Sequence, residues 1–301
     1  MSKKVLVVKG GFSAEREVSL VSGQGIAAAL TEEGYETKEH DLHDVREFLN
    51  VLNEFKPDVV FNALHGNWGE DGEIQGLLDM LQIPYTHSGL KASAVGMDKQ
   101  ITKLVCQSIG IKTPLGEKTT YREFAKTGTA IAMPYVIKPV CDGSSVGVYI
   151  IRSAADLKQV EFADDDEILI EKYIDGQELT VSVLQGKALT VTEMRPQEGF
   201  YDYHAKYTDG ATLHIIPAEI PEPIFNEALH NAEKLHKALE CKTVSRCDFR
   251  YNKQDGLVLL EINTAPGMTP LSLVPEQYKH CGGTYSKLCK ILVEEASCRK
   301  I

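Results

Sequence analysis

Residues 4–34 read KVLVVKGGFSAEREVSLVSGQGIAAALTEEG. The apolar run over 4–8 is typical of a buried strand, and Gly10-Gly11 ends it. A helical pattern follows from about Val18 to Glu33 and stops at Gly34, a residue that commonly ends helices. This order of strand, glycine turn and helix predicts the start of a unit in which helices connect parallel strands.

The next segments repeat that order. Residues 36–41 can form a second strand, residues 44–55 are helix-like, and an apolar strand is expected over 59–64. A β-α-β-α-β order predicts a parallel sheet with helices on its faces. Ligands of such sheets gather at the carboxyl ends of the strands, where Gly10-Gly11 and His65-Gly66 both lie.

The pattern changes after a helix expected over 98–109. Short strands separated by turns then predominate, which predicts two smaller α+β units after the N-terminal α/β domain. The polar and aromatic residues of 196–212 are typical of a mobile loop. The expected strands are 135–139, 147–151, 167–171, 178–184, 244–250 and 257–262, and the expected helices are 224–239 and 284–296.

Composition narrows the functional classes. The 301 residues suggest two or three compact units, and the net charge of −11 argues against nucleic acid or an anionic membrane as the main partner. Seven scattered cysteines without a CxxC pair indicate reduced thiols. The N-terminal apolar run is too short for a signal peptide, and no stretch approaches the ~20 apolar residues of a membrane span. We therefore expect a cytoplasmic protein.

Residues 138–147, KPVCDGSSVG, combine a strand end with a loop rich in glycine and serine. Small residues let backbone N–H groups approach a phosphate, and Lys138 supplies a positive charge beside them. The spacing is not that of a Walker A loop, and no helix follows. The alternative is a β-hairpin whose turn is rich in Gly and Ser and whose lysine is solvated.

Two expected strands carry a candidate metal site. Arg246 and Asp248 share one face of the first strand, and Glu261 and Asn263 share one face of the second. If the strands pair as a hairpin through the turn near Asp255-Gly256, the carboxylate and amide oxygens converge. Such a set suits Mg²⁺ with substrate phosphates. The alternative is a set of polar residues on the solvated face of a hairpin.

Three weaker motifs remain. The loop from Asn263 to Leu273 contains Pro and Gly, and its amides could hold an oxyanion or form an ordinary turn. Glu15 could bind a cationic amine, although helix capping by Ser13 or Glu15 is the alternative. Residues 171–178 combine an expected edge strand, a turn and a second strand, where backbone groups could meet an adenine and Glu178 a ribose hydroxyl.

Taken in order, these segments resemble the D-alanine–D-alanine ligases of the ATP-grasp superfamily over nearly the whole chain. The matching motifs are GGFSAEREVS at 10–19, LHG at 64–66, GEDG at 69–72, MDK at 97–99, KP at 138–139, GSSVG at 143–147, YDYHAKY at 201–207, RCD at 246–248 and EINTAPGMT at 261–269. The resemblance implies a Rossmann-like, pre-ATP-grasp N-terminal domain (1–87), followed by a two-part ATP-grasp fold with a central (88–176) and a C-terminal subdomain (177–301).

The resemblance also implies roles for individual residues. Lys99, Lys138 and, on loop closure, Lys206 would hold ATP phosphates, near Ser144 and Ser145. Glu171, Lys172, Ile174, Glu178 and Leu260 would line the adenine and ribose pocket. Asp248, Glu261 and Asn263 would bind two Mg²⁺ ions, with Mn²⁺ as an alternative. Glu15, with His65 nearby, would bind the first D-alanine; Ser144 and Tyr207 would connect that site to the mobile loop. Arg246 and the Gly267 amide would stabilise an oxyanion, and Ser272 and Leu273 would bind the second carboxylate.

The implied activity is ATP-dependent formation of D-alanyl-D-alanine through an acyl phosphate, with release of ADP and phosphate, for peptidoglycan precursor synthesis. A homodimer formed through the N-terminal domain is also implied. His204 stands where an acid or another polar residue is usual, whereas Tyr207 is intact and favours an amine as second substrate. The alternatives are a different second substrate such as D-lactate or D-serine, another carboxylate–amine ligase, and a non-catalytic ATP-binding regulator.

Overall fold

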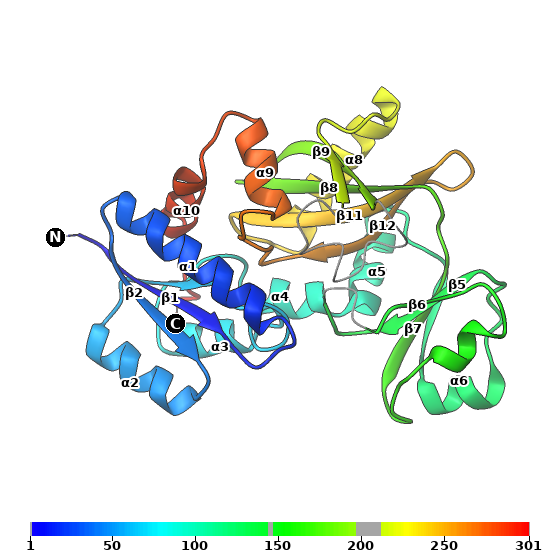
Figure 1. The fold of residues 1–301 in the computed structure, drawn as a ribbon, viewed down its shortest axis with the longest axis horizontal. Helices are drawn as coiled ribbons and strands as arrows, with labels where there is room; N and C mark the ends of the chain where they lie inside the picture. The colour runs from blue at the N-terminus through cyan, green and yellow to red at the C-terminus, as the bar shows by residue number, and fades with distance from the viewer. Residues whose placement is uncertain (1, 144–146, 197–211, 301) are drawn as a thin grey trace.

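The computed structural model describes residues 2–143, 147–196 and 212–300. These residues form three β-sheets with helices packed around them. Figure 1 shows the three-stranded sheet at one end of the molecule, the four-stranded sheet at the other, and the five-stranded sheet beginning between them. The first sheet is parallel and the other two are antiparallel, so the predicted α/β unit followed by α+β units is confirmed.

The parallel sheet has the strand order β2-β1-β3. The side chains of Val5, Leu6, Val7 and Val8 in β1 are fully buried, because helices cover both faces of the sheet. The predicted elements of this unit are all present. Their bounds are β1 Lys4–Gly10, α1 Arg16–Glu32, β2 Glu36–Leu42, α2 Val45–Phe55 and β3 Val59–Asn62.

Three helices connect the parallel sheet to the rest of the chain: α3 (Glu73–Met80), α4 (Leu90–Met97) and α5 (Lys99–Ser108). The sequence predicted only α5. Asp98 separates α4 from α5, and its carboxylate accepts a hydrogen bond from the Ile101 N–H at 2.9 Å, which caps α5. This cap fixes where α5 begins and therefore where Lys99 lies.

The four-stranded sheet has the order β4-β7-β5-β6. The expectation that the strand at 167–171 is an edge strand is wrong, because β7 pairs with both β4 and β5. The sequence of β4, GEKTT, has no apolar alternation, so it gave no strand signal. The elements of this unit are β4 Gly116–Thr120, α6 Tyr121–Thr127, β5 Tyr135–Pro139, β6 Tyr149–Ile151, a 3₁₀ helix at Asp156–Gln159, and β7 Glu167–Lys172.

The five-stranded sheet has the order β10-β9-β8-β11-β12. The predicted strands β8, β11 and β12 form its centre and one edge, whereas β9, β10 and the helix α9 were not predicted. The elements are β8 Gln177–Leu184, β9 Lys187–Pro196, β10 Thr212–Ile215, α8 Glu222–Ala238, β11 Val244–Asn252, β12 Gly256–Asn263, α9 Leu273–His280 and α10 Tyr285–Glu294.

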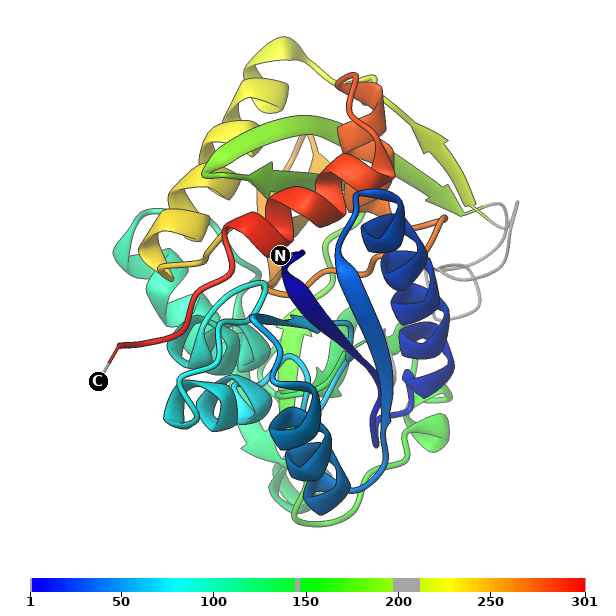
Figure 2. The same cartoon turned by 90° about the vertical axis from the view of Figure 1, so that its left-hand side faces the viewer.

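One hydrophobic core joins the two ends of the chain. Val5, Val7 and Phe61 of the parallel sheet pack in the same cluster as Leu288 and Leu292 of α10. Figure 2 shows α10 alongside α1, which agrees with their contacts. The parallel sheet is thereby held against the C-terminal part of the chain. The divisions at residues 87 and 176 stay a prediction.

Within residues 2–143, 147–196 and 212–300, no helix combines the length and the apolar character that crossing a membrane requires.

Candidate active site

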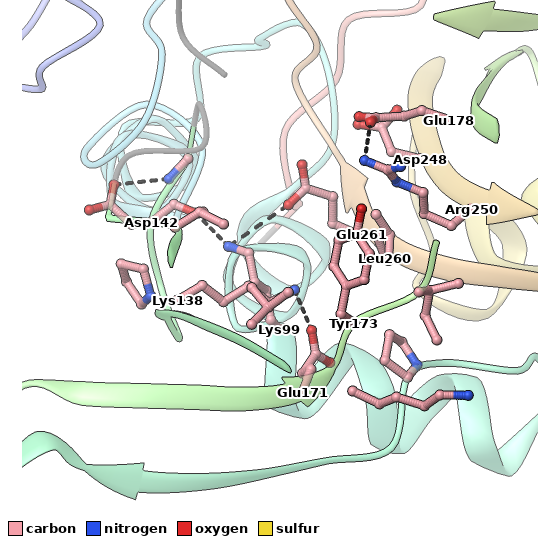
Figure 3. Close-up of a pocket in the computed structure, with 17 residues that line it drawn as sticks. Lys99, Lys138, Asp142, Glu171, Tyr173, Glu178, Asp248, Arg250, Leu260 and Glu261 are labelled. Atoms are coloured by element: carbon pink, nitrogen blue, oxygen red, sulfur yellow. Dashed lines mark hydrogen bonds and ion pairs between the residues drawn. The ribbon is translucent and has the colours of Figure 1, made fainter. Parts of the chain in front are cut away.

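A cavity lies between the two antiparallel sheets and α5, with about 840 Å³ of empty space when its open mouth is included. Seven residues expected at an ATP site line it: Lys99, Lys138, Glu171, Lys172, Ile174, Glu178 and Leu260. Two expected metal ligands, Asp248 and Glu261, line it as well (Figure 3). The expected residues Ser144, Ser145, Lys206 and Tyr207 lie outside the described residues, as does His204.

Lys99 lies at one end of this cavity. Its side chain is buried, and its ammonium donates to the Asp142 carbonyl oxygen and lies 4.0 Å from Glu261 Oε2. Burial lowers the pKa of Lys99, while the charge of Glu261 opposes that shift. An anion next to a poorly solvated ammonium stabilises its positive charge strongly, so this end of the cavity suits a phosphate.

Glu171 lies behind this end of the cavity, between two lysines. Its Oε2 accepts from Lys138 and its Oε1 accepts from Lys103 of α5. Burial raises the pKa of Glu171, but the charges of Lys138 and Lys103 outweigh burial and hold the pKa below its ordinary value. Glu171 is therefore ionised, and Lys138 is held at the cavity wall.

The opposite end of the cavity combines an ion pair with an apolar wall. Arg250 and Glu178 face each other on β11 and β8, with Nη2 to Oε2 at 2.6 Å. On β12 a bulge leaves Leu260 without a partner, because Asp248 pairs with Glu261 and Phe249 with Leu259. Neighbouring strand residues normally point to opposite faces, but at this bulge both Leu260 and Glu261 line the cavity. This end can therefore accept a flat base and a polar sugar.

The expected metal ligands lie together on the hairpin of β11 and β12. Asp248 is directly opposite Glu261, and Arg246 is opposite Asn263. Asp248 accepts from Thr180 Oγ1 at 2.6 Å, from Arg246 Nε at 2.9 Å and from Arg246 Nη2 at 2.7 Å. Asn263 Nδ2 lies 3.4 Å from Asp248 Oδ2. These four contacts occupy about the four acceptor positions of a carboxylate, so a cation bound by Asp248 would take the place of at least one of them.

The donor set fits a hard divalent cation that also binds substrate oxygens. Two carboxylates and one amide supply oxygen ligands without filling a coordination shell, and Mg²⁺ prefers this arrangement next to phosphates. Among the described residues, no group of three or more His, Cys, Asp or Glu side chains is placed to hold a metal by itself.

Glu15 lies where the parallel sheet meets the loop that follows β5. The side chain is buried, and its Oε2 would lie 3.0 Å from a Cβ added to either Gly66 or Gly143. Glu15 occupies the N-cap position of α1, but its carboxylate makes no capping hydrogen bond. The capping interpretation of Glu15 is therefore wrong. Ser13 Oγ instead accepts from the Glu15 N–H and donates to the His65 carbonyl oxygen.

His65, Gly267 and Ser272 lie close to one another. A Cβ added to Gly267 would lie 3.0 Å from Ser272 Oγ and 3.9 Å from His65 Cε1. His65 itself is buried and bonds to Ser22 Oγ at 3.1 Å. Ser272 precedes Leu273, the first residue of α9, and a helix N-terminus of this kind attracts carboxylates. The structure thus brings together three residues that lie up to 207 positions apart in sequence.

Comparisons with known proteins agree with this geometry. The family model described as "D-ala D-ala ligase C-terminus" matches residues 109–294, and "D-ala D-ala ligase N-terminus" matches residues 37–88. A D-alanine–D-alanine ligase from Zymomonas mobilis is 50% identical over 98% of this chain and 94% of its own length. A D-alanine–D-alanine ligase from Parvibaculum lavamentivorans is 48% identical over 99% of this chain and 98% of its own length.

The chain belongs to the D-alanine–D-alanine ligase family. The crystal structure of such a ligase from Bacillus anthracis is 35% identical, covers 98% of this chain and 97% of its own, and has a TM-score of 0.83. The same enzyme complexed with ATP has a TM-score of 0.82 at 34% identity. The expected family and its ATP-grasp fold are confirmed.

The sequence did not predict several residues that lie in this cavity or behind it. Arg250 could have been found, because it continues the alternation of Arg246 and Asp248 along β11. Lys103 also left a signal, since it follows Lys99 by four residues and shares its helix face. Tyr173, Pro114 and Val148 line the cavity through packing of separate segments, and nothing local in the sequence indicates it.

Proposed function

We propose that this chain joins two D-alanine molecules into D-alanyl-D-alanine, with conversion of ATP to ADP and phosphate, as a step in peptidoglycan precursor synthesis. One observation carries the proposal. A single cavity is lined by Lys99 and Lys138 and also by the paired carboxylates of Asp248 and Glu261. Such a set suits the phosphates of a nucleotide together with its cation.

The residue types suit an acyl phosphate route. A carboxylate is a poor electrophile, so the γ-phosphoryl group of ATP is first transferred to the carboxylate oxygen of one D-alanine. The amine of the second D-alanine, after loss of a proton, attacks the acyl carbon and forms a tetrahedral oxyanion. The bond to the phosphate oxygen then breaks and phosphate leaves. Positioning and electrostatic stabilisation supply most of the catalysis in this chemistry.

The residues divide this work as follows. Lys99 and Lys138 bind phosphate oxygens, and Glu15 binds the ammonium of the first D-alanine. Arg246 and the Gly267 N–H stabilise the oxyanion. Ser272 and Leu273, at the N-terminus of α9, bind the carboxylate of the second D-alanine, whose charge the helix dipole favours. His65 is held by Ser22 and lies near Gly267, so it would lie close to the bound amino acids.

Asp248, Glu261 and Asn263 would hold two Mg²⁺ ions, or Mn²⁺ in their place, through oxygen ligands. The cations would neutralise charge on the phosphates. Arg246 orients Asp248 for this role through two hydrogen bonds.

Further expectations belong to the same proposal. Ser144, Ser145, Lys206 and Tyr207 would complete the phosphate and amino acid sites, as the family resemblance implies. The protein would work in the cytoplasm as a homodimer formed through its N-terminal domain. Exposed apolar side chains at Met80 and Leu81 support an interface on that domain.

The test is to incubate the pure protein with ATP, Mg²⁺ and D-alanine, and to measure phosphate and dipeptide together. We expect equal amounts of phosphate and D-alanyl-D-alanine, with neither formed from L-alanine. Phosphate without this dipeptide, or a mixed product with D-lactate or D-serine, would mean that the second substrate is not D-alanine. Absence of phosphate with every carboxylate tested would instead favour a regulator that binds ATP without catalysis.

A further inference from the structure

The lysine that lies behind the cavity, Lys103, is not explained by direct contact with a nucleotide. Lys138 and Glu171 line the cavity, whereas Lys103 is not one of its described lining residues. Lys103 and Lys138 bind different oxygens of the same carboxylate, that of Glu171. All three side chains are at most 12% exposed, so water does little to screen their charges.

The backbone is shaped to let this contact form. Lys103 lies one helical turn after Lys99 on α5, so both lysines project from the same face. Gly116 of β4 pairs with Glu171, and a Cβ added to Gly116 would lie 2.8 Å from both Lys103 Nζ and Glu171 Cγ. Only glycine leaves room at this point for the ammonium to reach the carboxylate.

The charges explain what the contact achieves. If Glu171 paired with Lys138 alone, the two charges would cancel, and Lys138 would be bound most strongly to the carboxylate. With Lys103 on the other oxygen, the three groups carry one net positive charge. That charge can face the cavity only through Lys138, because Lys138 is the lysine of the group that lines it.

We propose that Lys103 is a positioning residue of the ATP site, which acts through Glu171 to set the place and the effective charge of Lys138. The inference rests on the proposed ATP-dependent function. Lys103 itself touches no substrate. Its removal should leave Glu171 bound to Lys138 alone, and the affinity of the cavity for polyphosphate should fall.

The experiment compares K103M with K118M. Lys118 forms a similar ion pair between β4 and β7, with Glu167 at 2.8 Å, but on the surface and away from the cavity lining. Binding of Mg²⁺-ATP is measured by calorimetry, and KM and kcat by phosphate release at saturating D-alanine. We expect K103M to raise the Kd and KM for ATP about tenfold and to change kcat less than about threefold. K118M should match the unaltered chain.

A double-mutant cycle separates this role from simple support of the fold. In an E171Q background there is no carboxylate to hold Lys138, so adding K103M should change the Kd for ATP by less than about twofold. An equal loss of affinity in both backgrounds would overturn the proposal, as would an unchanged Kd in K103M. Calorimetry does not depend on dipeptide formation. If the unaltered chain bound ATP but made no D-alanyl-D-alanine, the proposed function would fail while the binding data still decided the role of Lys103.

Discussion

At the scale of single residues, Glu15 depends on two neighbours that lack side chains. Gly66 follows the parallel sheet and Gly143 follows β5, and any Cβ at either position would come within 3.0 Å of the Glu15 carboxylate. Glu15 is thus enclosed by two separate segments and remains in position to meet an ammonium group. A buried carboxylate binds such a group more strongly than an exposed one does.

We expect E15Q to raise the KM for D-alanine by roughly 10- to 100-fold, because the charged partner of the ammonium is replaced by a neutral amide. The affinity for ATP should stay within about twofold. Initial rates at varied D-alanine, together with calorimetry of Mg²⁺-ATP, measure both quantities. E17Q is the matched control, since Glu17 is an exposed glutamate in the same helical turn. An unchanged KM in E15Q would remove Glu15 from the amino acid site.

At the scale of secondary structure, the buried side chain of Gln277 links α9 to the five-stranded sheet. The amide of Gln277 accepts from the Ser182 N–H at 2.9 Å and donates to the Thr180 carbonyl oxygen and to Thr192 Oγ1. The register of β8 and β9 shifts between Val181 and Val183, which is where the Ser182 N–H lies. Gln277 therefore satisfies a backbone donor that the irregular pairing leaves free, and it fixes the helix that begins after Ser272.

Q277L should lower the free energy of unfolding by roughly 2–4 kcal/mol, because it leaves buried backbone groups without partners. The variant should also raise the KM for D-alanine more than the KM for ATP, since the N-terminus of α9 is no longer fixed. Chemical unfolding and initial rates test the two effects. K279M changes an exposed residue of the same helix and should alter neither the free energy of unfolding nor the KM for D-alanine. Equal rises in both KM values would mean that Gln277 supports the whole site rather than α9.

At the scale of the whole molecule, burial of histidines makes the folded state sensitive to acid. His87 is buried, and its Nε2 has no hydrogen-bond partner among the described atoms. Burial lowers its pKa from 6.5 to about 3, with a smaller contribution from the nearby His65. The unfolded chain therefore binds a proton below about pH 6.5 that the folded chain does not bind. The contribution of His87 to the free energy of unfolding is therefore fully present above pH 6.5 and is lost as the pH falls towards 3.

We expect the free energy of unfolding to fall by up to ~1.4 kcal/mol per pH unit below pH 6 on account of His87 alone. Burial also lowers the pKa of His40 and His236, so the total slope is steeper. H87Q should reduce the slope between pH 6.5 and 5, whatever it does to stability at pH 7. H230Q, an exposed control, should keep it. Urea unfolding at four pH values gives the slopes; identical slopes in H87Q and the unaltered chain would contradict the assignment.

The parts of this protein that the sequence predicted well depend on local rules. The parallel sheet follows from apolar runs and glycine stops within the first 64 residues. The convergence of Asp248, Glu261 and Asn263 follows from the two-residue period of strands joined by a tight turn, and the observed register confirms it. Short or polar elements such as β4 and α9 were missed, because tertiary contacts and not their own patterns hold them in place.

The sequence by itself determined the family, the order of the units and which residue types can bind phosphate and a cation, because these are carried by motifs of a few adjacent residues. Only the tertiary structure decided that Lys103 and Lys138 share the carboxylate of Glu171, and that a bulge turns Leu260 into the cavity. These features join segments from different elements. Their formation depends on the packing of sheets and helices against one another, and a linear pattern holds no information about that geometry.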